Sequence, residues 1–170
     1  MLSRGFTLIE LVVILLIIGV LLGLVGIVYT RSPVDEVRQE AEKLAQLLQV
    51  AQDEATTQGR LYGIELVADG YRFLVLDDTS QLIPLERDDL LRAQRFANAV
   101  EIGTVSIEGA RAADKIRIVF VPTGIAPNFE IALRKKDARW FVLGTADGRI
   151  RAAPTLEPQS NAAIGRFHVA

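Results

Sequence analysis

The residues most able to do chemistry lie at the start of the chain, where a carboxylate interrupts an apolar run. Glu10 stands five residues after Gly5, and the residues from Leu11 to Tyr29 carry no formal charge. An ionised carboxylate inside a bilayer costs about 2.5–3.5 kcal/mol, so it needs a partner. Cleavage between Gly5 and Phe6 would create an α-ammonium group one helical turn from Glu10. If the chain were cut there, the new amine would neutralise Glu10, on the same helix or on a neighbouring one. Without a cut, Glu10 would lie near the helix end and reach the lipid headgroups.

The apolar run that holds this acid predicts a membrane helix. It is rich in Leu, Ile, Val and Gly, and about 20 such residues cross the hydrocarbon core of a bilayer. A secretory signal peptide fits less well, because its apolar region has about 7–15 residues and ends in a small-residue cleavage site. We therefore expect residues 1–5 to be a leader peptide and residues 6–30 to be a transmembrane helix segment.

The first ten residues also resemble a known signal. Arg4 to Glu10 reads RGFTLIE and is followed at once by the apolar run, which is similar to the processing signal of type IV pilins and type II secretion pseudopilins. The resemblance implies cleavage after Gly5 by a prepilin peptidase at the cytoplasmic side of the inner membrane, and N-methylation of Phe6. It also implies a single-pass protein with a periplasmic head. In the assembled fibre, Glu10 would contact the Phe6 amine of an adjacent subunit.

The remaining residues have the size of one domain, and their first part predicts a second helix. Ser32 suits a helix cap and Pro33 suits the first helical position, while Gly59 suits the left-handed residue that ends a helix. Between them the apolar residues recur at helical spacing, at Val34, Val37, Ala41, Leu44, Leu48, Ala51 and Ala55. We expect an amphipathic helix over residues 31–59 that continues the membrane helix as a kinked rod and packs on the head.

Beyond residue 60 the pattern predicts short strands. Residues 61–66 and 71–76 flank Asp69-Gly70, which is a hairpin signal. A short helix capped by Asp88 is expected over Asp88–Phe96. Further strands are expected over residues 105–107, 115–121, 129–133, 139–143 and 148–151. The fold class is therefore α+β, a long N-terminal helix packed on an antiparallel, β-sandwich-like head over residues 60–151, with a tail over 152–170 that matches no pattern.

The second half of the chain narrows the resemblance. Ile118-x-Phe120-x-Pro122-x-Gly124, Phe129-x-Ile131-x-Leu133, Trp140-x-Val142 and Gly148-Arg149-Ile150 resemble the head of H-type minor pseudopilins of the type II secretion system. The resemblance implies a structural subunit near the tip of a pseudopilus that supports export of folded proteins across the outer membrane. Its partners would be the other minor pseudopilins and the major pseudopilin. The acid-rich, calcium-binding loop of major pseudopilins is not visible in the sequence.

The sequence offers little support for catalysis. The single histidine, His168, has no neighbouring acids, and the chain has no cysteine. Asp77-Asp78 and Asp88-Asp89 are adjacent pairs without metal-binding spacing, so we interpret them as solvated loop charge. We expect no catalytic residue, metal or cofactor. A signal-anchored periplasmic enzyme remains as an alternative, and it predicts that Glu10 can be replaced without harm.

Charge is distributed unevenly along the chain, which leaves a second alternative. Residues 31–130 contain eleven basic and seventeen acidic residues, whereas residues 131–170 contain seven basic and three acidic ones. A basic patch could form from Arg134, Lys135, Lys136, Arg139, Arg149 and Arg151. Such a patch could meet acidic neighbours in a fibre, or hold nucleic acid in a minor pilin of a type IV pilus or DNA-uptake system.

On the strand that holds Trp140 and Phe141, alternation predicts one core residue and one contact residue.

Overall fold

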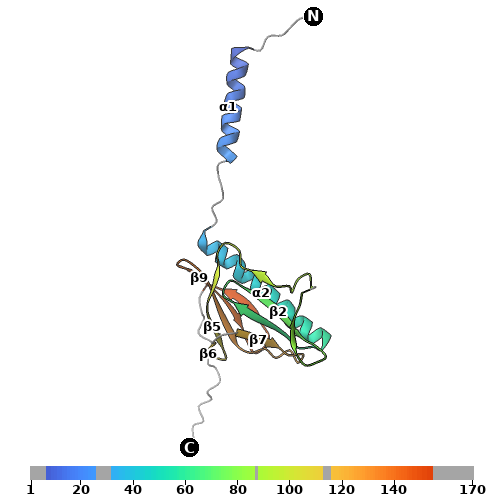
Figure 1. The fold of residues 1–170 in the computed structure, drawn as a ribbon. Helices are drawn as coiled ribbons and strands as arrows, with labels where there is room; N and C mark the ends of the chain where they lie inside the picture. The colour runs from blue at the N-terminus through green and yellow to red at the C-terminus, as the bar shows by residue number, and fades with distance from the viewer. Residues whose placement is uncertain (1–6, 26–31, 87, 113–115, 155–170) are drawn as a thin grey trace, which may run out of the picture. The chain divides into compact units, whose positions relative to one another are not determined.

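A computed structural model describes residues 7–25, 32–86, 88–112 and 116–154, with the side chains of residues 21–25 left out. The chain divides into two compact units, Met1–Arg31 and Ser32–Ala170. The second unit is called the head below, and its helix and strands are shown in Figure 1. The predicted continuity of the helical rod through residues 26–31 lies outside the described residues.

The described residues of the first unit form the helix α1 (Leu8–Val25). Thr7 precedes the helix, and its carbonyl oxygen accepts hydrogen bonds from the backbone N–H of Glu10 and of Leu11. The Thr7 hydroxyl oxygen lies 3.4 Å from the same Glu10 nitrogen, which is the position of an N-cap contact. Among the described residues, no helix combines the length and the apolar character needed to cross a membrane.

The head begins with α2 (Pro33–Gln58), and the predicted caps of this helix are confirmed. The Ser32 hydroxyl accepts the Val34 N–H, Pro33 takes the first helical position, and Gly59 has a φ of 64° in the left-handed region. The predicted apolar stripe is buried from Val37 to Ala55. Val34 was expected on this stripe but is 47% exposed, because it lies in the first turn, beyond the edge of the core.

Two antiparallel sheets complete the head. The N-terminal sheet has the order β3-β2-β1-β7, with β4 also pairing with β2. Its strands are β1 (Tyr62–Val67), β2 (Gly70–Leu76), β3 (Leu82–Pro84), β4 (Gln94–Arg95) and β7 (Ile116–Phe120). The predicted hairpin is confirmed, since β1 pairs with β2 from Tyr62 opposite Val75 to Val67 opposite Gly70.

The C-terminal sheet has the order β10-β9-β8-β5-β6. Its strands are β5 (Glu101–Ile107), β6 (Ala110–Arg111), β8 (Phe129–Lys135), β9 (Ala138–Gly144) and β10 (Ile150–Ala153). The register of β5 against β8 shifts between Ile102 and Val105, so Gly103 and Thr104 together form a β-bulge. Three of these strands were predicted nearly to their bounds, whereas β6 and the first half of β5 were not predicted.

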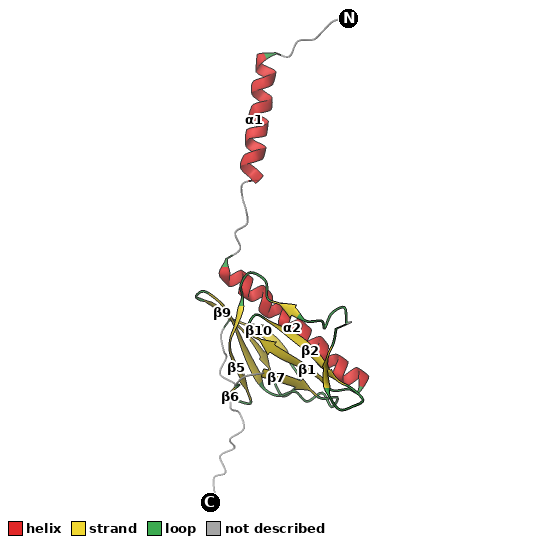
Figure 2. Ribbon diagram, viewed as in Figure 1, coloured by secondary structure: helices red, strands yellow, loops and turns green. Residues whose placement is uncertain are grey.

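Both sheets pack on α2, which makes contacts with strands of each (Figure 2). Fully buried side chains of the helix, such as Leu44 and Leu48, share one core with side chains of the two sheets. Phe120 of the N-terminal sheet and Phe129 of the C-terminal sheet meet edge to face, with ring centroids 6.5 Å apart. The predicted α+β class, a helix packed on antiparallel sheets, is therefore confirmed.

The helix predicted over Asp88–Phe96 is wrong. Asp88 does cap the backbone, because its carboxylate accepts the N–H groups of Leu90 and Leu91. The chain then turns into the short strand β4 instead of continuing as a helix. In β4 the backbone pairs with the start of β2, with Arg95 opposite Gly70. Burial of Leu91 and Phe96 accompanies this pairing, so long-range packing overrides the local helical signal.

Candidate functional site

The N-terminal site is only partly described. Gly5 and Phe6, the predicted cleavage and methylation residues, lie outside the described residues. Glu10 lies in the first turn of α1 and its side chain is exposed. A negative charge in this turn is favoured by the helix dipole. The structure thus places the acid in the first turn of α1.

The side chains around Glu10 on α1 are apolar and exposed. Every large apolar residue from Leu8 to Val20 is exposed, between 40% for Ile14 and 83% for Leu8. Apolar side chains cover all sides of the helix, which is typical of a helix surrounded by lipid or by other helices. An acid in such a helix is a candidate functional residue, because an ionised carboxylate in an apolar environment is costly.

The six residues of the predicted basic patch do not all lie together. Arg134 and Arg139 are directly opposite each other across β8 and β9. Lys135 lies on the other face of β8, where its ammonium group contacts the carboxylate of Glu36 on α2. Only 20% of the Lys135 side chain and 14% of the Glu36 side chain are exposed. This ion pair joins the first turns of α2 to the C-terminal sheet.

The remaining three cations lie elsewhere in the C-terminal sheet. Lys136 occupies the β8–β9 turn with a φ of 53°, and Arg151 lies on β10 opposite Leu143. Arg149 holds Asp147 in the β9–β10 turn, with a nitrogen 2.6 Å from the carboxylate. The Thr145 hydroxyl and then Arg149 lower the pKa of Asp147 to about 2. Arg149 is thus paired within its own turn.

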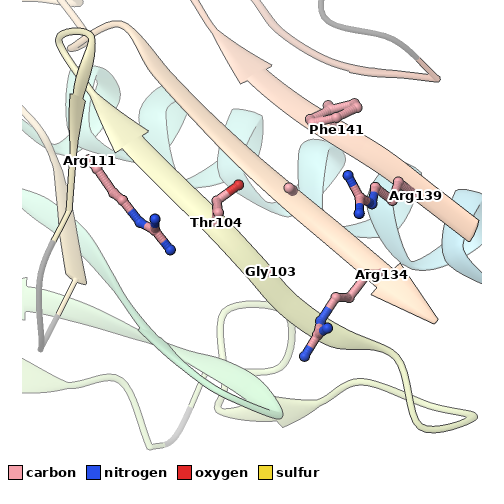
Figure 3. Close-up of a pocket in the computed structure, with 7 residues that line it drawn as sticks. Gly103, Thr104, Arg111, Arg134, Arg139 and Phe141 are labelled. Carbon is pink, nitrogen blue, oxygen red and sulfur yellow. The ribbon is translucent and has the colours of Figure 1, made fainter. Parts of the chain in front are cut away.

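A groove that the sequence did not predict lies on the outer face of the C-terminal sheet, the face turned away from α2. It has a volume of about 370 Å³. Its lining comes from four strands: Gly103, Thr104, Arg111, Ala132, Arg134, Arg139 and Phe141. Figure 3 shows the three arginine side chains around Thr104 and Gly103. Arg111 was missed because it belongs to the acidic part of the sequence, and only the pairing of β6 with β5 brings it here.

Alternation along β9 is confirmed. Trp140 packs against the core and Phe141 faces the groove on the opposite side of the strand. The two residues therefore divide into a core residue and a residue on an accessible surface, as their adjacent positions predict.

Glu65, the most deeply buried acid among the described residues of the head, was also missed. It lies opposite Arg72 on β2 and opposite Arg117 on β7, and both guanidinium groups contact its carboxylate. Burial would raise the pKa of Glu65, but the hydrogen bonds from Arg72 and then Arg117 outweigh burial and lower it. The signal in the sequence was a single acid in the middle of an apolar strand. The ion pairs stabilise the sheet and do not form an open site.

One acid of each pair considered as metal ligands binds the backbone. The Asp77 carboxylate accepts the N–H groups of Thr79 and Gln81 in the turn after β2, and the Gln81 bond is the largest cause of its lowered pKa. Asp88 accepts backbone N–H groups as described above. Within the described residues, no group of three or more potential metal ligands comes together. His168 lies outside the described residues.

Comparisons with known proteins agree with this arrangement. The family model described as "Type II transport protein GspH" matches residues 40–149. The model described as "Prokaryotic N-terminal methylation motif" matches residues 1–26, which include Gly5, Phe6 and Glu10.

Two curated relatives carry the name "Type II secretion system protein H". The protein from Klebsiella pneumoniae is 30% identical over 118 residues, which is 69% of this chain and 69% of the relative. The protein from Pseudomonas aeruginosa is 44% identical over 91 residues, or 51% of each chain. The match thus spans about half the length of the Pseudomonas relative.

Solved structures share the fold. The minor pseudopilin EpsH from the type II secretion system of Vibrio cholerae has a TM-score of 0.62 at 17% identity, covering 75% of this chain and 100% of that chain. The type IV minor pilin FimU of Pseudomonas aeruginosa has a TM-score of 0.51 at 23% identity, covering 73% and 90%. At these identities the likeness concerns the fold alone.

Proposed function

The chain belongs to the family of type II transport proteins described as GspH, and we propose that it works as a minor pseudopilin. In this function it is a structural subunit near the tip of a type II secretion pseudopilus, and it supports export of folded proteins across the outer membrane. The observation that carries the proposal is the presence of both matches in one chain. An N-terminal methylation motif leads into a head of the GspH family.

Processing is the first step that we propose. A prepilin peptidase removes residues 1–5 by cutting after Gly5, and the new N-terminus of Phe6 is methylated. The motif match over residues 1–26 supports this assignment. The freed ammonium group of Phe6 then lies near Glu10, on its own helix or on that of the neighbouring subunit. Pairing of these two charges lowers the cost of placing the acid in an apolar environment.

Before assembly, residues 6–30 anchor the chain in the inner membrane by a single pass, with the N-terminus cytoplasmic and the head periplasmic. The exposed apolar side chains of α1 support this placement. During assembly the helix leaves lipid and packs against the helices of other minor pseudopilins and of the major pseudopilin. An apolar surface is suited to both environments, since lipid and helix packing each cover it.

Co-expression with a prepilin peptidase tests the processing step. The mass of the purified chain should fall by that of residues 1–5 and rise by one methyl group. A variant with Gly5→Val should keep the full mass, because the site of cleavage is altered. An unshifted mass of the unmodified sequence in the presence of active peptidase would contradict the proposal.

Replacement of Glu10 distinguishes a fibre subunit from a membrane-anchored enzyme. Glu10→Ala should prevent incorporation into sheared pseudopili and reduce secretion of folded exoprotein in a strain that lacks its own copy. The control is Glu42→Ala, since Glu42 is an exposed acid of α2 whose carboxylate lies 3.8 Å from Arg38. Full secretion with the Glu10 variant would favour the enzyme alternative.

The alternative of a minor pilin in a DNA-uptake system takes second place. It depended on a continuous basic patch, whereas Lys135 contacts Glu36 and Arg149 contacts Asp147. The family match also favours secretion over uptake. Salt-dependent DNA binding that is lost when Arg134, Lys135 and Lys136 are replaced would reverse this order.

A further inference from the structure

The groove on the outer face of the C-terminal sheet has the composition of a binding site for negative charge. Three of its lining residues are arginines, and none is acidic. Arg111, Arg134 and Arg139 come from three different strands, so the pairing of β6, β5, β8 and β9 brings them to one place. A guanidinium group presents a planar set of donors that matches a carboxylate or a phosphate.

Two of the three arginines have no acidic partner within the described part of the chain. Arg134 lies 3.2 Å from the carboxylate of Glu101, its neighbour on β5. Arg111 and Arg139 make no ion pair with a described residue. Like charges placed together without counter-charge raise the local potential and attract an anionic partner. Among the described residues, the groove therefore holds more positive charge than its ion pairs neutralise.

The shape of the groove arises from small residues beneath long ones. Gly103 and Thr104 form the bulge of β5, and Ala132 faces them on β8. Their short side chains leave a depression between the arginines (Figure 3). Phe141 forms an apolar wall next to Ala132, its cross-strand partner. A ligand that fits must combine negative charges at the ends with apolar atoms in the middle.

We propose that this groove binds an extended, acidic segment of another protein, with two or three carboxylates contacting the arginines and an apolar side chain against Phe141. The inference adds a partner to the proposed function. It rests on that function for one point, that the partner is another protein of the secretion apparatus. A carboxylate-rich peptide satisfies each feature of the site, since arginine forms bidentate bonds with carboxylates. The volume of about 370 Å³ suits a few side chains.

Nucleic acid fits this groove less well than a peptide does. Binding of a phosphate backbone generally uses a track of cations combined with aromatic side chains on which bases stack. Here Lys135 faces α2 and Arg149 is paired in its turn, so the cations form a short cluster and not a track. Phe141 is the single aromatic residue that lines the groove.

The test measures binding of fluorescein-labelled peptides to the purified full chain in detergent micelles by fluorescence anisotropy. The probe is the heptapeptide Gly-Asp-Glu-Phe-Asp-Glu-Gly, and the control probe has Asn and Gln in place of Asp and Glu. We expect the acidic probe to bind at least about tenfold more tightly than its amide control, with affinity that falls as salt is added.

Variants locate the site. Arg111→Gln combined with Arg139→Gln should weaken binding of the acidic probe at least about tenfold, because two cations that contact its carboxylates are removed. Neither arginine has an ion-pair partner among the described residues, so the change should disturb the fold little. The matched control is Arg92→Gln combined with Arg149→Gln, which removes the same charge outside the groove and should leave the affinity within about twofold. Unfolding of both variants in urea, followed by Trp140 fluorescence, establishes that the head remains folded.

Three outcomes would overturn the inference. These are equal binding of the acidic and amide probes, unchanged binding by the groove variant, and tighter binding of a ten-nucleotide thymidine strand than of the acidic peptide. None of them depends on fibre assembly. The proposed function is judged separately by processing at Gly5 and by the Glu10→Ala variant, so the two failures can be distinguished.

Discussion

The ion pairs of Glu65 with Arg72 and Arg117 allow a prediction of how the free energy of unfolding depends on pH, including the sign of that dependence. The Glu65 side chain is 5% exposed, whereas those of Arg72 and Arg117 are 48% and 46% exposed. Replacement of both arginines by methionine would leave a buried carboxylate without a partner. Such a change costs about 3–5 kcal/mol in the free energy of unfolding. Glu65→Gln leaves two solvated cations instead, and should cost only about 1–2 kcal/mol.

The pH dependence should differ between the native chain and the double variant. In the native chain the arginines lower the pKa of Glu65. Its contribution is therefore present above the ordinary pKa of a glutamate and is lost as the pH falls through the lowered value. Without the arginines, burial is unopposed and raises the pKa. The penalty in the double variant should then be largest at neutral pH and shrink as the pH falls through that raised pKa.

The assay is urea unfolding followed by the fluorescence of Trp140, the only tryptophan of the chain, which packs against the core of the head. The difference in unfolding free energy between the double variant and the native chain should decrease from pH 7 to pH 4. Addition of Glu65→Gln to the double variant should restore most of the lost stability at pH 7. A pH-independent difference, or no restoration, would refute the reasoning.

Two further substitutions test how α2 and the C-terminal sheet are held. Lys135→Ala leaves the largely buried Glu36 without its cation and should lower the unfolding free energy by about 1–2 kcal/mol. The control Lys43→Ala, on the exposed face of α2, should change urea unfolding little. Gly144→Ala would place a Cβ atom against the ring of Phe129. It should cost about 1–3 kcal/mol, and an unchanged melting temperature would contradict this packing.

Local signals predicted α2 well because the residues that define it are neighbours in the sequence. Ser32, Pro33 and Gly59 each act on the backbone next to them, and the structure confirms all three. The β1–β2 hairpin follows for the same reason, since its turn joins adjacent strands. The turn itself consists of residues 68–69, and Gly70 begins the next strand instead of adopting a left-handed conformation.

The strand β4, which the sequence did not predict, depends on a contact between residues that are distant in the sequence. At Gly70 the absence of a side chain admits the carbonyl of Gln94, so β4 can pair with β2. This contact replaces the helix expected after Asp88. Nothing near residue 94 in the sequence indicates the partner that lies some twenty residues away.

The six residues of the predicted basic patch do not form one cluster, and the alternation of side chains along a strand explains why. Arg134 and Lys135 are adjacent on β8, so they must point to opposite faces of the sheet. Arg134 consequently lies in the groove and Lys135 contacts α2. The contribution of Arg111 was not predictable in this way, because it depends on which strand forms the edge of the sheet.

The most direct test of the account is the N-terminus of the chain recovered from assembled pseudopili. Filaments sheared from cells that express the tagged chain can be digested, and the N-terminal peptide identified by mass spectrometry. The account predicts a peptide that starts at N-methylated Phe6 and includes Glu10. A filament-derived chain that still starts at Met1 would contradict it, because Glu10 would then lack the ammonium group that its position requires.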